Sequence, residues 1–513
     1  MKKRVIAALM ATVLTIGGMA GCGKTTDDRE EKEKGETAGK EEITTIYWQW
    51  PSLGSTGSGF QAVEDALNEM MEKDIGVHVV LEPVLVTDLL NQTTLTVTSG
   101  EQLDLSLQIG TGVGTYVSNG LIQPIDEYID EYGADIKEKC GDSLNAAYYQ
   151  DKLYGMPVAY ISGNAYGYVA RKDILDKYGI TVDENKIYTL DEIEDIFATV
   201  KAGEGEKFFL NIPQTNSAGS MLHGAYCEDD MLGASRASGV LMLNRSFEDL
   251  SIVNLFETEE YKDYANRCYD WAQKGYVSAD AATNTEDPNV LIASGNYLGA
   301  FTWTSPNGIT DMQAATGYEL VGLTTVAPYI FASNLGISWQ VPITSENPGK
   351  AVEAMNYIYK NPEACALLKF GIEGQDYEVV EKTEDGTQIK YLADDPSTLP
   401  YYTPFGVYGD RLSWPVVQPT PVNMNKIMKE WDEAIPENRI SAANGYTFVA
   451  DSVSTEISAV NAVITQYSDS IEAGALNPEE ALPEFIKALK GAGIDKVIEE
   501  NQRQLDEWAE KQK

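Results

Sequence analysis

The sequence predicts an α/β protein with parallel strands, and three neighbouring segments lead to that prediction. Residues 43–50 are rich in Ile, Tyr and Trp, which favour strands. After a Gly/Ser loop, apolar residues from Phe60 to Met70 recur at helical spacing, and Gly76 ends the helix. Residues 77–81 (VHVVL) then predict a second strand. A strand–helix–strand unit of this kind is the building block of parallel α/β sheets.

A glycine-rich loop follows the next predicted strand. A helical stretch over 86–98 precedes the short apolar segment 103–109, and glycines stand at 110, 112 and 114 directly after it. Such a run is weak evidence for a phosphate loop. We expect a loop at the carboxyl end of a strand, where open α/β sheets bind ligands.

The composition changes after residue 370. Residues 373–425 hold acidic turns, many prolines and several aromatic residues, which predict an irregular segment. From residue 425 the chain is mainly helical. Asn477 and Pro478 form a good helix start, while Pro483 is expected to kink that helix or delay its beginning.

Length and composition limit the protein class. The 513 residues suffice for two or three domains, and 43% hydrophobic and 23% charged residues exclude a disordered or collagen-like chain. Asp and Glu total 79 against 38 Lys and Arg, a net charge of −41. Such a surface repels phosphate backbones and anionic lipid head groups, so we expect no nucleic-acid binding and no broad membrane-surface role.

Histidine and cysteine usage argues against metal or thiol chemistry. The chain has only two histidines, and His78 lies in an apolar strand, where a structural role is expected. The sequence therefore indicates no metal-binding residues and no cofactor, and it leaves open whether a calcium ion is bound. Four widely spaced cysteines form no Cys-x-x-Cys pair, and buried thiols or a disulfide both remain open. These cysteines are Cys140, Cys227, Cys268 and Cys365.

The N-terminus has the anatomy of a signal peptide. A basic start (2–4), a short apolar run (5–16) and small residues lead to Met19-Ala20-Gly21-Cys22. This end resembles a bacterial lipobox, with Met19 where Leu is usual, in which Cys22 receives a diacylglycerol. We predict a signal peptide over 1–21 and a lipidated flexible linker over 22–42. The alternative is an ordinary secretion signal with an incidental cysteine.

Two sets of motifs follow one another along the chain. The first set is 99–105 (SGEQLDL), 119–126 (NGLIQPID), 151–157 (DKLYGMP), 170–180 (ARKDILDKYGI) and 189–192 (TLDE). In this order they resemble motifs of the extracellular solute-binding proteins of carbohydrate ABC importers, family 1, with Leu190 where that family usually has Trp and Asp151 where it usually has Gly. The second set is 445–448 (GYTF), 466–467 (QY), 474–479 (GALNPE) and 493–506 (GIDKVIEENQRQLD). It resembles the C-terminal domain of a lipoprotein subgroup of these importers.

The resemblance implies a two-lobe, periplasmic-binding-protein-like α/β fold of type II, with a hinge and a helical C-terminal extension on the second lobe. By analogy, lobe 1 takes 43–157 plus 300–345, and lobe 2 takes 158–299 plus 346–513. The chain would cross between lobes near 157–160, 300–303 and Pro342. Closure about the hinge is the expected motion.

The resemblance also implies a function. The protein would be a monomer, lipid-anchored on the extracellular face of the cell membrane, that captures a sugar or oligosaccharide and delivers it to ABC permease subunits. Three alternatives remain: a receptor of the same fold for a peptide or other solute, a secreted carbohydrate-active enzyme, and an adhesive surface lipoprotein. No catalytic motif appears in the sequence, so we expect no enzymatic activity.

Sugars present apolar C–H faces and a rim of hydroxyls, so a binder needs aromatic rings and amide groups. Residues of these types at strand ends and where the chain crosses between the lobes are the candidates. The alternative for each aromatic residue is that its ring packs in the core. The candidates are Trp48, Gln49, Trp50, Gln108, Tyr116, Tyr160, Asn164, Gln214, Asn216, Trp303, Ser305 and Trp339.

Overall fold

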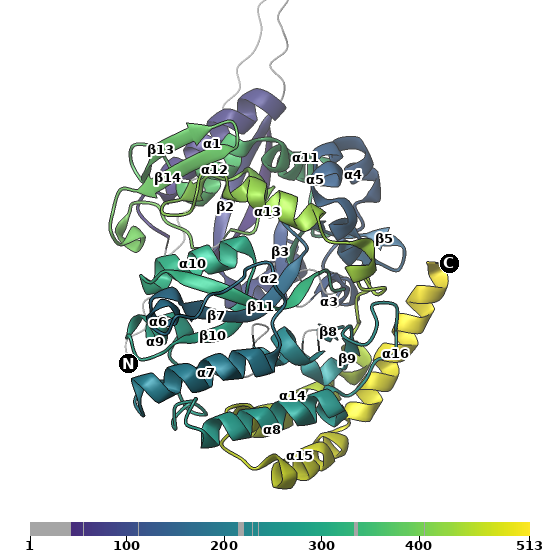
Figure 1. Cartoon of the computed structure of the whole chain (residues 1–513). Coiled ribbons are helices and arrows are strands. Elements are labelled where there is room, and N and C mark those ends of the chain that lie inside the picture. Colours follow the sequence, from purple (N-terminus) through teal and green to yellow (C-terminus); the bar gives the residue numbers. More distant parts are fainter. Residues whose placement is uncertain are drawn as a thin grey trace, which may run out of the picture. The chain divides into compact units, whose positions relative to one another are not determined.

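A computed structural model describes most of the chain from residue 43 onward (Figure 1). The predicted signal peptide, the lipidation site Cys22 and the linker lie outside the described residues, as do Gln214 and Asn216. The described ranges are 43–54, 56–110, 112–213, 220–227, 229–233, 235–332, 337–404 and 406–512.

The strand–helix–strand unit expected at the start of the fold is present. Strand β1 (Thr44–Ser52) pairs in parallel with β2 (Val77–Leu85), and α1 (Phe60–Ile75) connects them. The helix ends at Gly76, whose φ of 64° is left-handed and whose N–H donates to the carbonyl of Met71. A glycine adopts this conformation without strain, which confirms the predicted helix end.

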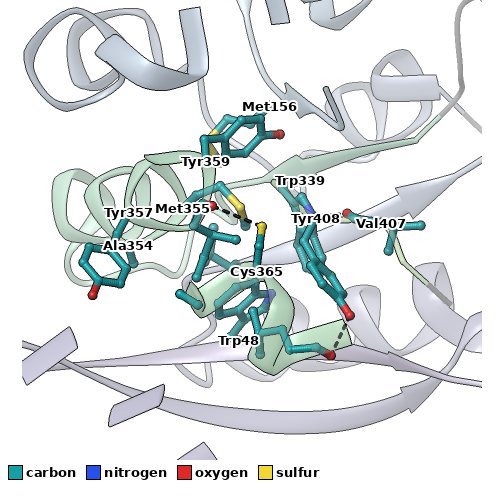
Figure 2. Packing of buried hydrophobic residues seen from close by; sticks show 14 of the residues in the cluster. Trp48, Met156, Trp339, Ala354, Met355, Tyr357, Tyr359, Cys365, Val407 and Tyr408 are labelled. Atoms are coloured by element: carbon teal, nitrogen blue, oxygen red, sulfur yellow. Dashed lines mark hydrogen bonds between the residues drawn. The ribbon is translucent and has the colours of Figure 1, made fainter. Parts of the chain in front are cut away.

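The first core lies around this unit, and we call it and the elements packed on it lobe 1. Trp48 meets Trp339 edge to face at 5.3 Å, and Tyr408, buried in the same cluster, stacks on Trp50 at 5.1 Å (Figure 2). The sheet β3–β12–β6 and a three-stranded sheet of β13, β14 and β15 belong here. The strands are β3 (Ser106–Ile109), β6 (Met156–Pro157), β12 (Ile337–Gln340), β13 (Tyr377–Thr383), β14 (Gly386–Tyr391) and β15 (Val416–Val417). The helices are α2 (Leu89–Ser99), α3 (Gly112–Ser118), α4 (Asp126–Tyr132), α5 (Ala134–Cys140), α11 (Pro348–Lys360) and α12 (Pro362–Phe370). A small hairpin joins β4 (Tyr148–Tyr149) to β5 (Lys152–Leu153).

Separate clusters of buried residues form lobe 2, around the antiparallel sheet β10–β7–β11. Tyr168, Phe197 and Trp271 pack ring against ring in the largest of these clusters. The strands are β7 (Asn164–Arg171), β8 (Asp229–Met231), β9 (Val240–Met242), β10 (Gly299–Trp303) and β11 (Leu320–Tyr329). The helices before the C-terminal region are α6 (Lys172–Lys177), α7 (Leu190–Glu204), α8 (Glu259–Gln273), α9 (Pro288–Ala293) and α10 (Pro306–Thr316).

The C-terminal region is helical, and three of its helices pack on lobe 2, as predicted: α14 (Ser454–Glu472), α15 (Pro478–Ala492) and α16 (Ile494–Lys511) (Figure 1). The helix before them, α13 (Met424–Glu433), packs instead in a small cluster with Val416 of β15. Val460 and Phe485, from α14 and α15, are buried in the same cluster as Tyr168 of β7. The Asn477 side chain caps α15 by accepting from the N–H of Glu479 at 3.0 Å. Pro483 is accommodated inside that helix.

The pairing of strands divides the chain differently from the predicted lobe boundaries. β10 and β11 both pair with β7, so residues 299–329 belong to lobe 2 rather than to lobe 1. Conversely, α11 and α12 pack into the core of lobe 1, although we assigned 346–513 to lobe 2. Strand pairing causes the difference: an apolar strand has the same pattern in either sheet, so the sequence does not say which partner it joins.

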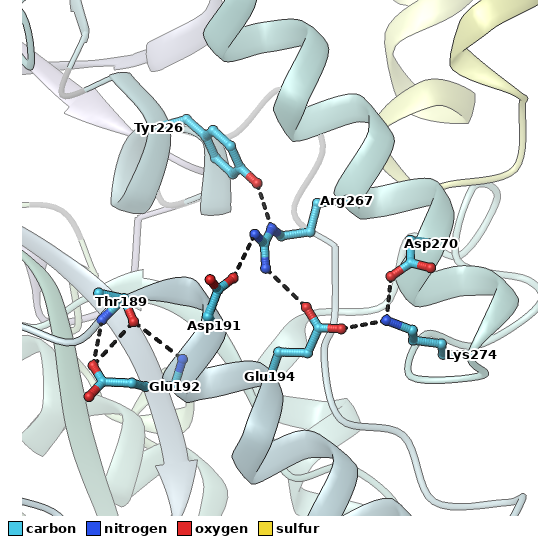
Figure 3. A network of polar contacts seen from close by, with 8 residues as sticks. All are labelled: Thr189, Asp191, Glu192, Glu194, Tyr226, Arg267, Asp270 and Lys274. Atoms are coloured by element: carbon cyan, nitrogen blue, oxygen red, sulfur yellow. Dashed lines mark hydrogen bonds and ion pairs between the residues drawn. The ribbon is translucent and has the colours of Figure 1, made fainter.

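Ion pairs fasten the helical layer of lobe 2. Arg267 of α8 pairs with Asp191 and Glu194 of α7, each at 2.9 Å, and Lys274 reaches Glu194 at 2.6 Å (Figure 3). Thr189 precedes α7 and forms a capping box with Glu192, within a motif that carried the family resemblance. These ion pairs connect α7 to α8.

The structure also describes four of the cysteines. All four thiols are buried: those of Cys140, Cys227, Cys268 and Cys365. Burial raises the pKa of the Cys140 and Cys365 thiols to about 12, so they are poor nucleophiles.

Within the described ranges, no helix has the length and apolar character that a membrane span requires. The same ranges contain no group of three or more His, Cys, Asp or Glu side chains placed to hold a metal ion.

Candidate ligand-binding site

A cavity of about 450 Å³ lies between residues of the two lobes. Lobe 1 contributes the end of β3, the glycine loop and β12, while lobe 2 contributes the β8 end, the 446–450 segment and α14. The described lining residues of lobe 1 are Gln108, Gly110, Gly112, Gly114, Thr115, Ala146, Ala147, Pro157, Ile337 and Ser338. Those of lobe 2 are Met231, Leu232, Gly233, Ser235, Ser238, Ala332, Tyr446, Thr447, Phe448, Val449, Ala450, Ile457 and Asn461.

The glycine loop gives the cavity one of its walls. It follows β3 directly, where we expected a ligand loop. Gly110 and Gly112 have φ values of 73° and 70°, which favour glycine, and the Gly112 N–H donates to Gln108 Oε1 at 2.9 Å. A Cβ on Gly114 would lie 3.3 Å from side-chain carbons of Tyr149 and Val449. Because Gly114 has no side chain, the glycine loop can approach Val449 of lobe 2 closely.

The chemistry of the walls suits an uncharged ligand. Among the described lining residues none is Asp, Glu, Lys or Arg. The Gln108 amide, which donates to the Ser338 hydroxyl at 3.4 Å, and the Asn461 amide offer both donors and acceptors. Phe448 and Tyr446 add aromatic surface. Amides, hydroxyls and rings without a charge match a solute that carries hydroxyl groups on apolar faces.

Five of the predicted site residues lie inside lobe 1 instead. Trp48 and Trp339 have no exposed surface and Trp50 is 3% exposed. The indole N–H of Trp339 donates to the carbonyl of Val407 at 2.6 Å. The other two are satisfied by the backbone of lobe 1: the Gln49 amide donates to Leu89 O, and the Tyr116 hydroxyl to Leu107 O. These five residues are buried in lobe 1 and are not part of the cavity wall.

Tyr160 and Ser305 come together where the chain first crosses between the lobes. The Asn307 amide donates to the Tyr160 hydroxyl at 3.1 Å and accepts from the Ser305 hydroxyl at 3.0 Å. The Arg411 guanidinium lies 4.1 Å from the centre of the Tyr160 ring. Burial raises the pKa of the nearby Asp311 carboxyl. This polar cluster joins segments far apart in the sequence, but neither predicted residue lines the cavity described above.

The last two predicted residues belong to the sheet of lobe 2. Trp303 is partly buried and tilts against Tyr166, with ring centres 4.7 Å apart. The Asn164 amide donates to the carbonyl of Ser162 at 3.1 Å. Of the twelve predicted ligand residues, the described cavity wall thus contains Gln108 alone.

Sequence reasoning missed most of the lining side chains, including Ser338, Phe448 and Asn461. Two signals pointed toward them. The glycine run marked the lobe 1 wall, and the GYTF motif at 445–448 contributes three residues to the lobe 2 wall. No local pattern marks Asn461. An Asn in a helix is usually solvent-exposed, and this one lines the cavity only because of where α14 packs.

Comparison with known proteins places the chain in a family. Residues 66–369, more than half of the chain, match the profile described as "Bacterial extracellular solute-binding protein". Residues 442–510 match a "Domain of unknown function (DUF3502)". A "Carbohydrate ABC transporter substrate-binding protein" of Streptococcus pneumoniae serotype 4 is 22% identical over 532 residues, covering 100% of this chain and 99% of that protein.

Solved structures share the fold. The N-glycan transport solute binding protein (NgtS) from Streptococcus pneumoniae has a TM-score of 0.74 at 19% identity, covering 92% of this chain and 100% of that one. Its complex with Man5GlcNAc has a TM-score of 0.62 at 19% identity, covering 92% and 99%. Its complex with Man1GlcNAc scores 0.65 at 18% identity, covering 91% and 100%. These likenesses confirm the predicted two-lobe fold, and the profile match shows that the chain belongs to the bacterial extracellular solute-binding proteins.

Proposed function

We propose that this protein captures a neutral oligosaccharide in the cavity between its lobes and delivers it to the permease of an ABC importer. The observation that carries the proposal is the cavity wall itself. It combines the amides of Gln108 and Asn461, the Ser338 hydroxyl and the Phe448 ring, with no charged residue among its described lining. Hydrogen-bonding groups beside an aromatic surface are what sugar recognition requires.

The relatives support the carbohydrate class. The Streptococcus pneumoniae relative is named as a carbohydrate ABC transporter substrate-binding protein, and NgtS was solved with two glycans. Both glycans in those complexes are composed of neutral sugars by name. An uncharged cavity in this chain agrees with a ligand of that kind.

Capture without chemistry is the second part of the proposal. Glycosidases of the usual kind place two carboxyl groups across the scissile bond. The described lining of the cavity offers no carboxylate, so it can hold a glycan but has no general acid for cleaving it. Incubation with oligosaccharides followed by product chromatography checks this, and turnover abolished by one carboxylate substitution would favour an enzyme.

The third part of the proposal is that a lipid anchors the protein to the membrane, and its support is the N-terminal sequence. Cys22 would carry the lipid, and 22–42 would be the tether that leaves a monomeric binding domain free on the extracellular face of the membrane. Metabolic labelling with a radioactive fatty acid tests it. Wild-type protein should be labelled and Cys22→Ala should not.

Calorimetry of residues 23–513 tests the central function. We expect binding to at least one member of a panel of neutral oligosaccharides, and Phe448→Ala should weaken it by at least tenfold. Tyr269→Ala, on α8 and outside the cavity lining, is the matched control and should bind as the wild type does. Binding of peptides with silence across all sugars would contradict the carbohydrate assignment while sparing the receptor.

A further inference from the structure

We infer that a groove beside the interlobe cavity is an outer subsite, which binds the distal sugar units of a long neutral oligosaccharide. The inference rests on the proposed function. The groove has a volume of about 730 Å³ and lies between the β4–β5 hairpin and α16. Tyr446, Thr447 and Val449 line both the groove and the interlobe cavity. The cavity and the groove are therefore adjacent, and we expect a long ligand seated in the cavity to extend into the groove.

The groove has aromatic surface on both sides. Tyr148 of the hairpin is 42% exposed, and Trp508 of α16 is partly buried with its ring 5.9 Å from that of Tyr446. Figure 1 shows β5 and the C-terminal end of α16 at the same side of the molecule. An exposed ring and a partly buried ring that line one groove from two different elements provide stacking surfaces for the apolar faces of sugars.

The walls are held in place before any ligand arrives. Gln504 of α16 clamps the backbone of Val449, accepting from its N–H and donating to its carbonyl, each at 3.0 Å. The Tyr446 hydroxyl donates to Asn501 Oδ1 at 2.7 Å. In the hairpin turn, Gln150 and Asp151 have φ values of 49° and 67°, the conformation of a tight two-residue turn. Binding therefore needs little ordering of the walls.

The charges of the groove exclude an acidic glycan. Its described cations are Arg503 and Lys511. The Arg503 guanidinium makes three bonds of 2.6 to 2.9 Å to the carboxylates of Glu500 and Glu507. Lys511 faces Asp151 at 3.7 Å across the groove. Carboxylates outnumber these cations in the described lining, so uronic or sialic acid units would be repelled and neutral units are favoured.

The test compares short and long glycans on wild type and variants. Calorimetry of residues 23–513 uses neutral oligosaccharides of several sugar types, each as a disaccharide and as a chain of six or more units, with Man1GlcNAc and Man5GlcNAc among them. We expect the long form of the recognised sugar to bind at least tenfold more tightly. Trp508→Ala and Tyr148→Ala should each remove most of that advantage and leave disaccharide affinity unchanged, while Trp508→Phe retains it.

Controls separate this inference from the function on which it rests. Tyr269→Ala should leave both affinities unchanged, and Phe448→Ala should weaken short and long glycans alike. Equal affinities for short and long glycans, or a length advantage that survives in both groove variants, would overturn the outer subsite alone. Absence of binding to every glycan in the panel would overturn the proposed function and the subsite with it.

Discussion

At the scale of single residues, burial decides whether a tryptophan belongs to the core or to a ligand site. The first strand places Trp48, Gln49 and Trp50 in sequence, and all three are buried, because β1 is covered on both faces as parallel strands usually are. The buried Gln49 amide is hydrogen-bonded, because it donates to Thr93 Oγ1 at 3.1 Å. A tryptophan that stacks on a sugar and one that fills a core look identical in sequence, so only packing distinguishes them.

Trp339→Ala tests the core role of the tryptophans. It removes a fully buried indole and the bond to Val407, and we expect it to lower the free energy of unfolding by about 3–5 kcal/mol. Trp339→Phe should cost less and should leave glycan affinity unchanged. Urea unfolding and calorimetry provide the two measurements. A Trp339→Phe protein of normal stability that no longer binds glycan would instead return this residue to the ligand site.

At the scale of elements, helices and their ends were predictable because their signals are local. Gly76 after α1, the Thr189 cap of α7 and the Asn477 cap of α15 all act within one turn. The glycine loop after β3 was also predictable. Strand pairing was not: β10 lies in lobe 2 because it pairs with β7, more than a hundred residues earlier, and no local pattern records that choice.

A buried ion pair fastens α14 to the rest of lobe 2 and supplies an element-scale prediction. Glu472 is 1% exposed, accepts from Arg236 at 2.6 Å and from the Tyr261 hydroxyl at 3.1 Å. Glu472→Gln replaces the carboxylate of this buried ion pair by a neutral amide, so we expect urea unfolding to show a loss of about 3–5 kcal/mol. The double variant Arg236→Met, Glu472→Met should cost less than Glu472→Gln. A loss below about 1 kcal/mol in the single variant would contradict this role.

The stability of α16 should depend on pH through Glu500. Hydrogen bonds from Arg503 and Gln504 lower the pKa of Glu500 to about 2 from the usual 4.5. Because the folded pKa is lowered, this stabilisation is present above pH 4.5 and is lost as the pH falls toward 2. Glu500→Gln should therefore lower the free energy of unfolding by up to about 1 kcal/mol at pH 7.

Urea unfolding at pH 7, 5, 4 and 3 measures this difference between wild type and Glu500→Gln. The difference should be steady at the two higher values and shrink at the two lower ones. Glu499→Gln, at the exposed neighbouring position of α16, is the control and should show no such trend. A difference that stays constant down to pH 3 would refute the contribution of the Glu500 carboxylate.

At the scale of the whole molecule, the family resemblance predicted two lobes and a C-terminal helical region on the second, and both are confirmed. The lobe boundaries were transferred by analogy and differ from the observed pairing. The first crossing, between β6 and β7, lies close to the expected 157–160. The cavity itself depends on segments from both lobes, such as Gln108 and Phe448, whose proximity no stretch of sequence contains.

Hinge closure is the corresponding prediction for the molecule. A ligand that contacts both walls of the cavity stabilises the conformation in which the walls are close. The radius of gyration from small-angle X-ray scattering should therefore decrease when saturating glycan is added to residues 23–513. The same addition to Phe448→Ala, at a concentration too low to bind it, is the control. An unchanged radius with fully bound glycan would argue against a closing hinge.

The most direct measurement is a crystal structure of residues 23–513 with a bound neutral oligosaccharide. The predicted result is a glycan between the lobes, with hydroxyls bonded to Gln108, Ser338 or Asn461 and a sugar face against Phe448. A glycan bound on an outer face of one lobe, with the interlobe cavity still filled by water, would contradict the account.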